Sequence, residues 1–321
     1  MTSGVDSSVP PTIGVDLGGT NLRVALVSGD GEVLADEHEP TGGDFDSLVS
    51  LIAGHARALA SRGGARAVGV GAAGLVDFEG TVHYAPNLPM LRHAPLGAAL
   101  SEALDLPVVV DNDANVAAWG EVCHGAAQGC RHALVITLGT GIGGGIILDG
   151  RVYRGGHGFA GEVGHWQLDP AGERCACGEP GHWEAAASGT ALGQLARAHA
   201  ADGRAPNVLA RAGGDPANVD GHEVGDSASA GEPDGVALLA DYARRVALGF
   251  VGLANILDPE IIVVSGGLVE LGDLLLAPLR TAFDHHLEGA EFRPSVPVVP
   301  AELGAQAGVV GAAALARELT E

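Results

Sequence analysis

Short apolar runs separated by glycine turns open the chain, and they predict β-strands. Residues 12–17, 21–28 and 32–39 each have the length and composition of a strand. The turn Gly18-Gly19-Thr20 separates the first two runs, and Asp30-Gly31 is a hairpin signal between the second and the third. We therefore expect three consecutive strands at the start of the ordered chain.

The same order of features returns at residue 133. Residues 133–138 predict a strand, Gly139-Thr140-Gly141 a turn, and residues 144–148 the next strand. Asp149-Gly150 again marks a hairpin, and a short apolar pair follows at 152–153. This weak internal repeat suggests two related α/β halves, although two unrelated sets of strands explain the pattern about as well.

The other elements follow from period and composition. Helical periodicity predicts helices at residues 45–60, 114–124, 235–257, 268–286 and 306–319. Further apolar runs predict buried strands at residues 67–71, 107–111 and 260–265. Residues 202–234 are Gly-rich and acidic without strong periodicity, so they predict an exposed, mobile insertion.

Charge excludes several classes of function. Of the 321 residues, 40 are Asp or Glu and 17 are Arg, there is no Lys, and the formal net charge is -23. Such a surface repels nucleic acids and anionic lipid, and a P-loop or Schiff-base lysine is excluded. The sequence has no apolar stretch long enough for a membrane span and no signal peptide at its N-terminus, so we expect a cytoplasmic protein.

The two glycine turns are candidate phosphate-binding loops. Backbone N–H groups can approach an anion where side chains are missing, and threonine adds a hydroxyl donor. The candidate residues are Asp16, Gly18, Gly19, Thr20 and Asn21 in the first loop and Thr137, Gly139, Thr140 and Gly141 in the second. Asp16 could hold Mg²⁺ through water, and Ser265-Gly266-Gly267 suits an adenosine group. One such loop is weak support, because Gly-Gly turns are common in hairpins, but two loops favour nucleotide phosphates.

Four polar residues stand where a predicted strand meets a predicted helix: Asp111, Asn112, Asp113 and Asn115. One of them suffices to cap the helix, which is the structural explanation. A carboxylate near a helix N-terminus stays ionised, so Asp113 could also act as a base toward a hydroxyl that Asn112 orients. Both interpretations stay open at this point.

The segment from Glu162 to Glu184 predicts a metal site. His165, Cys175, Cys177 and His182 supply two imidazoles and two thiols, the ligand set of a closed tetrahedral zinc site. The alternative is a pair of reduced thiols beside unrelated histidines. Glu162 and Glu184 flank the cluster, and a bound metal would hold their carboxylates in place for hydroxyl groups.

These segments together resemble the ROK family of sugar kinases and repressors, and within it most resemble the bacterial ATP-dependent glucokinases. The resemblance extends over nearly the whole chain, in the segments Asp16 to Arg23, Gly71 to Asp77, Ala85 to Leu88, Asp111 to Glu121, Thr137 to Gly145, Gly161 to His165 and Cys175 to Glu184. It implies an actin-like (ribonuclease H-like) two-domain α/β fold, with sugar and ATP in the cleft between the domains. It also implies phosphorylation of glucose at the 6-hydroxyl, with ATP, Mg²⁺ and a structural Zn²⁺.

The resemblance also assigns roles to residues. Asp113 corresponds to the catalytic base, and the sugar ligands correspond to Asn87, Asn112, Asp113, Glu162, His165 and Glu184. Gly189, Gly266 and Gly267 correspond to the lining of the nucleotide pocket. Two positions depart from the family pattern: His182 replaces a zinc cysteine, and the loop Gly71-Ala72-Ala73-Gly74 lacks the usual proline before its second glycine.

We also state expectations for the domain borders, for the oligomeric state and for the alternative functions. We expect a disordered leader at residues 1–11, a small domain at 12–111 joined by the C-terminal helix 306–321, and a large domain at 112–305 that contains the zinc site. A homodimer or homotetramer is expected from family habit. The rivals are an N-acylmannosamine or fructose kinase, a donor other than ATP (ADP or polyphosphate), and a sugar-responsive repressor without its DNA-binding domain.

Overall fold

The computed structural model describes residues 9–320 and divides the chain into two compact units. Unit 1 comprises Met1–Val135, Gly145–Gly161 and Glu302–Glu321, and unit 2 comprises Ile136–Gly144 and Glu162–Ala301. Most of the leader expected at residues 1–11 lies outside the described residues. Among the helices of residues 9–320, none combines the length and the apolar character that crossing a bilayer requires.

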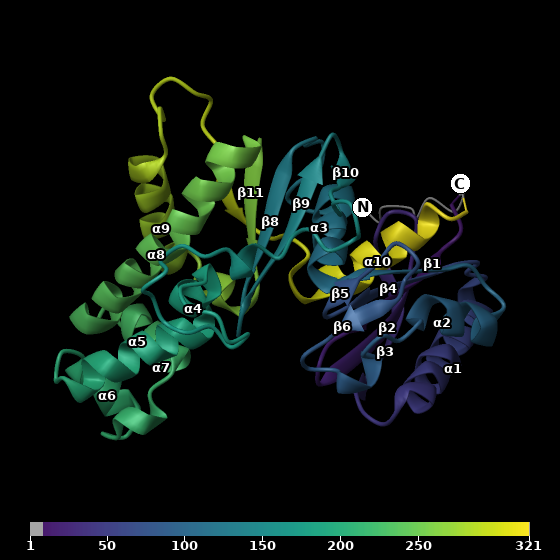
Figure 1. Ribbon diagram of the computed structural model, residues 1–321, viewed down its shortest axis with the longest axis horizontal. Coiled ribbons are helices and arrows are strands. Elements are labelled where there is room, and N and C mark those ends of the chain that lie inside the picture. The colour runs from purple at the N-terminus through teal and green to yellow at the C-terminus, as the bar shows by residue number, and fades with distance from the viewer. Residues whose placement is uncertain (1–8, 321) are drawn as a thin grey trace, which may run out of the picture. The chain divides into compact units, whose positions relative to one another are not determined.

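Unit 1 is an α/β layer structure around a five-stranded sheet in the order β3-β2-β1-β4-β7 (Figure 1). Its elements are β1 (Thr12–Leu17), β2 (Asn21–Val27), β3 (Val33–Pro40), α1 (Phe45–Gly63), β4 (Val68–Ala72), β5 (Leu75–Val76), β6 (Val82–Tyr84), α2 (Leu96–Leu104), β7 (Val108–Asn112), α3 (Asp113–His124), β10 (Arg151–Val152) and α10 (Ala307–Arg317). Strands β1, β2 and β3 pair antiparallel, whereas β1, β4 and β7 pair parallel. The carboxyl ends of β1 and β7 therefore lie at the same edge of the sheet.

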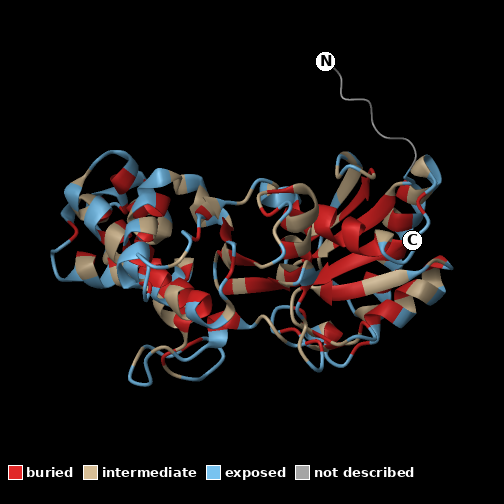
Figure 2. Ribbon diagram, turned by 90° about the horizontal axis from the view of Figure 1, so that it is seen from above, coloured by how far each residue is buried: buried red, intermediate tan, exposed pale blue. Residues whose placement is uncertain are grey.

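Successive side chains of β1 point to opposite faces of the sheet, and different helices cover these two faces. Ile13, Val15 and Leu17 are fully buried in the core that includes α1. On the other face, a Cβ atom at Gly14 would lie 1.9 Å from a carbonyl oxygen of α10, and one at Gly69 of β4 would meet α10 equally closely. Glycine thus lets α10 lie directly on the strands, and Figure 2 shows this layer as largely buried.

Unit 2 combines part of a second sheet with a group of helices. Strands β8 (Ala133–Leu138) and β9 (Ile142–Leu148) run through the positions where the chain passes between the units. The other elements are α4 (Trp183–Ala187), α5 (Gly189–Ala201), α6 (Pro206–Arg211), α7 (Gly221–Ser229), α8 (Pro233–Leu257), β11 (Ile261–Ser265), α9 (Asp273–His286) and β12 (Val298–Pro300). The sheet order β10-β9-β8-β11-β12 matches that of the first sheet. The internal repeat seen in the sequence therefore corresponds to two sheets of the same strand order.

Residues 202–234 are not the irregular segment that their composition predicted. They contain α6, α7 and the start of α8, and they bury Val208, Val224 and Ala228. Helix α7 begins with a capping box, in which the Asp220 and Glu223 side chains bond the backbone of the first turn in both directions. The expectation of a mobile insertion is wrong, because local capping and a few apolar contacts stabilise short helices here.

Most predicted elements differ from the structure by a few residues at their ends, and two differences are larger. The single helix expected at 268–286 is broken at Gly272, whose φ of 55° ends the short 3₁₀ helix Gly267–Leu271 before α9 begins. The predicted domain border at 111/112 also differs, because α3 groups with unit 1. Helix α3 packs closely on α10, where a Cβ atom at Gly311 would lie 1.8 Å from the carbonyl oxygen of Val116. Helices α2 and α5 and strand β12 were not predicted.

Candidate active site

The first predicted phosphate loop is the tight β1–β2 turn of unit 1. The Gly18 N–H donates to the Asn21 carbonyl at 3.0 Å, and the Asn21 side chain donates to the Thr20 hydroxyl at 3.2 Å. A Cβ atom at Gly19 would lie 2.7 Å from Cβ of Asn87, so this turn requires glycine there. The structure thus places Asn87, predicted as a sugar ligand, beside the predicted phosphate loop.

Two carboxylates lie close together at the carboxyl edge of the unit 1 sheet. Burial raises the pKa of Asp16 to about 6; the negative charge of Asp113 adds to the shift, and Arg23 opposes it. Burial also raises the pKa of Asp113, while the Ala114 N–H opposes that shift. The sequence led us to expect an ionised Asp113 near the helix N-terminus, whereas burial in this structure favours its protonated form. The roles of Asp16 as a Mg²⁺ ligand and of Asp113 as a base stay predictions.

The Asp113 side chain has one oxygen held and one available. Its Oδ1 accepts a hydrogen bond from the Ala114 N–H at 2.9 Å. The Asp113 N–H also bonds this carboxylate, and no other residue among 9–320 donates a hydrogen bond to its Oδ2. A base that is oriented through one oxygen can take a proton with the other.

Asn112 is the N-cap of α3, so the structural explanation holds for this residue. Its Oδ1 accepts from the N–H groups of Ala114 and Asn115 at 2.9 and 3.1 Å. Its Nδ2 donates to the carbonyl of Gly74 at 3.0 Å, which joins α3 to the loop that lacks the family proline. The carboxamide oxygen is thus occupied, and only the second Nδ2 hydrogen is left to orient a hydroxyl.

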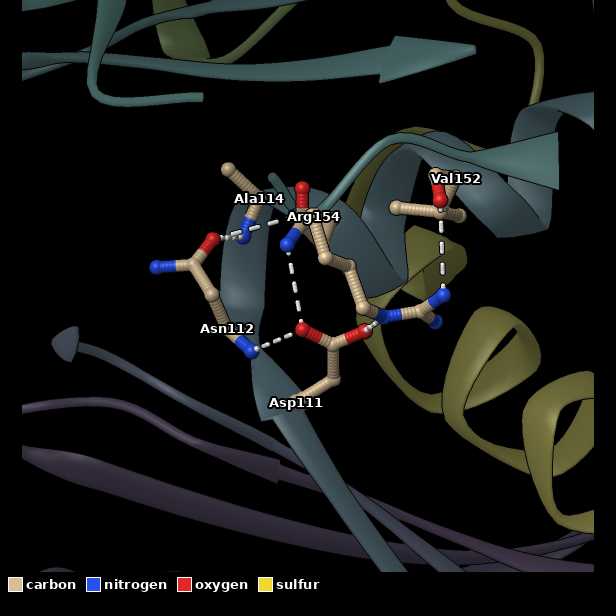
Figure 3. Close-up of polar contacts among 6 residues, drawn as sticks. Asp111, Asn112, Ala114, Val152 and Arg154 are labelled. Carbon is tan, nitrogen blue, oxygen red and sulfur yellow. Dashed lines mark hydrogen bonds and ion pairs between the residues drawn. The ribbon is translucent and has the colours of Figure 1, made fainter. Parts of the chain in front are cut away.

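Asp111 is a buried structural carboxylate, and its partner was not predicted. The Arg154 Nε donates to Asp111 Oδ2 at 2.6 Å, and Figure 3 shows the arginine reaching this carboxylate from beyond β10. Arg154 has no motif around it in the sequence. The sequence therefore gave no signal that these two residues form a pair.

Three glycine segments that are far apart in the sequence meet in unit 2. The Gly189 N–H donates to the Gly139 carbonyl at 2.7 Å, and the Thr190 hydroxyl donates to the Thr140 carbonyl at 2.7 Å. A Cβ atom at Gly266 would lie 2.3 Å from the carbonyl oxygen of Leu138. The structure therefore brings together the second phosphate loop and both segments assigned to the nucleotide.

A cavity of about 650 Å³ opens beside these segments and lies wholly within unit 2. Its lining includes Gly139, Thr140, Gly189 and Gly267 of the predicted nucleotide set. Ligand pockets of this size typically hold small molecules such as nucleotides. Helix α7 forms part of its wall, a contribution that sequence reasoning missed although the capping box signals the helix.

The four predicted metal ligands form one cluster in unit 2. Nitrogen and sulfur atoms of His165, Cys175, Cys177 and His182 all lie within 4.8 Å of one another. Cys175 Sγ is 3.8 Å from His165 Nδ1, and Cys177 Sγ is 3.2 Å from His182 Nδ1. Zinc–sulfur bonds of about 2.3 Å and zinc–nitrogen bonds of about 2.0–2.1 Å place tetrahedral ligands about 3.3–3.8 Å apart. The donor set suits such a site, and His182 supplies the fourth ligand where the family has a cysteine.

The two flanking carboxylates differ in their exposure and in the groups that they contact. Glu184 Oε2 accepts from the Ile142 N–H at 2.9 Å, and Oε1 accepts from the Cys175 thiol at 3.4 Å. A Cβ atom at Gly141 would lie 2.3 Å from Glu184 Oε2, so the second phosphate loop leaves room for this carboxylate. Glu162 is 42% exposed, with its Oε2 3.9 Å from His165 Nε2. Glu184 is thus rigidly placed, whereas Glu162 faces solvent.

Comparison with known proteins gives consistent matches over nearly the full length. The sequence profile of the ROK family matches residues 12–319. A glucokinase of Streptomyces coelicolor is 42% identical over 96% of this chain and 98% of its own length. The crystal structure of a ROK family glucokinase from Streptomyces griseus in complex with glucose and AMPPNP has a TM-score of 0.83 at 41% identity, covering 96% of this chain and 99% of that one. A ROK hexokinase from Thermus thermophilus has a TM-score of 0.82 at 35% identity, covering 97% and 99%. The actin-like two-domain α/β fold expected from the sequence is thereby confirmed.

Proposed function

Because the chain belongs to the ROK family, we propose that it catalyses the ATP-dependent phosphorylation of glucose at the 6-hydroxyl. The observation that carries the chemistry is the Asp113 carboxylate, which is oriented by one backbone N–H and keeps its second oxygen available. The identity of the sugar and of the donor is supported by the glucokinase relatives and by the related structure with glucose and AMPPNP. The activity is therefore that of a glucokinase.

In the proposed reaction, Asp113 accepts the proton of the 6-hydroxyl while that oxygen attacks the γ-phosphate. General-base catalysis of this kind supplies about 10²–10⁴-fold in rate. We assign the other hydroxyls to Asn87, Asn112, Glu162, His165 and Glu184, as the family resemblance implies. The second Nδ2 hydrogen of Asn112 is the group that it offers, since its oxygen caps α3.

The nucleotide is bound through backbone groups rather than through lysine. The chain contains no Lys, so the N–H groups of the two glycine loops and Mg²⁺ neutralise the phosphate charge. Asp16 is the residue that would hold Mg²⁺ through water, since a carboxylate with a pKa near 6 is largely ionised at neutral pH. Gly189, Gly266 and Gly267 border the adenosine, and the cavity of about 650 Å³ accommodates it.

A structural zinc bound by His165, Cys175, Cys177 and His182 completes the proposal. The metal would stabilise a segment with few apolar contacts and fix His165 and Glu184 for the sugar. A cytoplasmic location and a homodimer or homotetramer stay predictions from the family resemblance.

The proposal is tested by measuring ADP release from purified protein with glucose, mannose, fructose and N-acetylmannosamine in parallel. We expect glucose to give the highest kcat/KM with ATP and Mg²⁺. A higher kcat/KM for fructose or N-acetylmannosamine would make the protein one of the rival sugar kinases. No phosphorylation of any sugar, together with a shift of a DNA probe in a gel, would favour the repressor.

A further inference from the structure

Arg154 is anchored at the start of α3 although it lies some forty residues away in the sequence. It follows β10, where the Tyr153 N–H donates to the Ile146 carbonyl at 2.7 Å and fixes the backbone. Its Nε donates to Asp111 Oδ2 at 2.6 Å, and the Asp111 side chain is only 5% exposed (Figure 3). The contact thus joins the segment that follows β10 to the end of β7, and both segments belong to unit 1.

The other oxygen of Asp111 holds the first turn of α3. Asp111 Oδ1 accepts from the Asn112 N–H at 2.7 Å and from the Asn115 Nδ2 at 3.0 Å. Asn115 is itself fully buried, so this turn has little freedom to move. The orientation of the Asp111 carboxylate therefore sets the position of the backbone that carries Asn112 and Asp113.

The orientation of Asp111 in turn depends on Arg154. No other cation pairs with Asp111 among residues 9–320. A buried carboxylate that loses its partner is strongly unfavourable, and it turns toward solvent or takes up water.

We propose that Arg154 is a positioning residue for phosphoryl transfer: through Asp111 it fixes the first turn of α3 and so the direction of the Asp113 carboxylate. In this proposal Arg154 acts on Asp113 only through its contact with Asp111, not by touching the reacting oxygen or the phosphate. The inference rests on the proposed kinase activity with Asp113 as the base. It follows from the geometry because displacing a reacting group by about 1 Å costs about 100-fold in rate.

The test compares Arg154→Gln with Arg154→Lys and with Arg131→Gln in the full chain. Arg131 is a matched control because it makes an ion pair with Asp149 in which both side chains are exposed. We expect R154Q to lower kcat for glucose phosphorylation about 10- to 100-fold with KM for ATP within about twofold. We expect R154K to recover most of kcat, since a single N–H to Asp111 carries the contact, and R131Q to match wild type.

A double variant, Asp111→Asn with Arg154→Gln, covers the case that R154Q does not fold. It removes the unpaired buried charge, so we expect its melting temperature to be close to that of wild type. The neutral side chain at 111 can still accept hydrogen bonds from the Asn112 N–H and the Asn115 Nδ2, but it has lost the contact with Arg154. We therefore expect kcat to stay at least about 10-fold low.

The possible results distinguish a failure of the positioning role of Arg154 from a failure of the proposed kinase activity. Wild-type kcat in folded R154Q, or in the folded double variant, overturns the positioning role while leaving the kinase activity intact. A raised KM for ATP at unchanged kcat in R154Q also overturns it, because Arg154 would then bind substrate directly. A wild-type protein that phosphorylates no sugar contradicts the proposed function itself, and the positioning role with it.

Discussion

Asp16 and Asp113 occupy surroundings that favour their protonated forms, yet the proposed reaction needs both as anions. Burial is the main cause of both shifts, and mutual repulsion adds to the shift of Asp16. A protein that keeps such groups ionised at neutral pH gives up folding stability for function. This cost is measurable at Asp16.

We expect Asp16→Asn to raise the melting temperature at pH 7.5. The pKa of Asp16 rises from 3.8 to about 6 on folding, so the folded state binds the proton more tightly. The free energy of unfolding therefore falls as the pH rises through the window from about 4 to about 6. At pH 7.5 the ionised carboxylate costs at most about 3 kcal/mol, which the Asn side chain avoids.

The measurement is the melting temperature of wild type and D16N at pH 4 and at pH 7.5. The advantage of D16N is expected to vanish at pH 4, where wild-type Asp16 is protonated in the folded protein. Glu102→Gln, at an exposed position on α2 in the same unit, is the control. If D16N melts no higher than wild type at pH 7.5, Asp16 carries no such cost.

The sequence could suggest a role for some of these residues but not for others. Asp113 and the four candidate metal ligands stand in dense local motifs, so the sequence alone was enough to select them as candidates. Asn112 was ambiguous, because an Asn before a helix suits both a cap and a ligand, and the structure shows the cap. Arg154 could not be found, because its partner is distant in the sequence and no local pattern marks a long-range ion pair.

At the scale of elements, the 162–184 segment is the part whose order depends most on a ligand. Among its residues, one short helix and one 3₁₀ turn are regular, and Gly178 at φ +102° is required for the turn between the cysteines and His182. Few apolar side chains of the loop are buried. A metal bound by its four ligands is therefore expected to replace the missing core.

We expect about one zinc per chain in freshly purified protein, and Cys177→Ser to lose most of it. Removing zinc, by this substitution or by a chelator, is expected to weaken glucose binding about 10-fold or more and ATP binding much less, because His165 and Glu184 are held by the cluster. Metal analysis and calorimetric titration with each ligand measure both effects. Cys130→Ser, outside the cluster, is the control.

Protein that contains no zinc and binds glucose normally would contradict the metal assignment. Equal weakening of glucose and ATP binding in C177S would instead indicate general loss of folding. The kinase proposal does not depend on either result, because Asp113 lies in unit 1 and the cluster in unit 2.

Elements with strong periodicity were predicted well, and those that depend on context were not. The strand at residues 12–17 and the strand at 133–138 agree with the structure at both ends. Helix α7 was missed because its apolar residues are few and its capping signals were outweighed by its acidic composition. The break at Gly272 was missed because the apolar pattern continues across it.

At the scale of the whole molecule, repetition was visible in the sequence but the division into units was not. The two sheets share one strand order, which the recurring strand and turn signals indicated. The border could not be predicted, because the chain passes between units inside β8 and β9 rather than at a linker. Each unit carries one part of the proposed machinery: Asp113 and the first glycine loop in unit 1, and the nucleotide cavity and the metal cluster in unit 2.

The most direct test of the central claim is the rate of ADP release with glucose and ATP by wild type and by Asp113→Asn. We expect D113N to lower kcat by about 10²–10⁴-fold. We also expect a dissociation constant for glucose within a few-fold of wild type, because Asn keeps the size of the side chain and the Ala114 hydrogen bond. Near-normal turnover by D113N would show that this carboxylate is not the base, and the account would then be wrong.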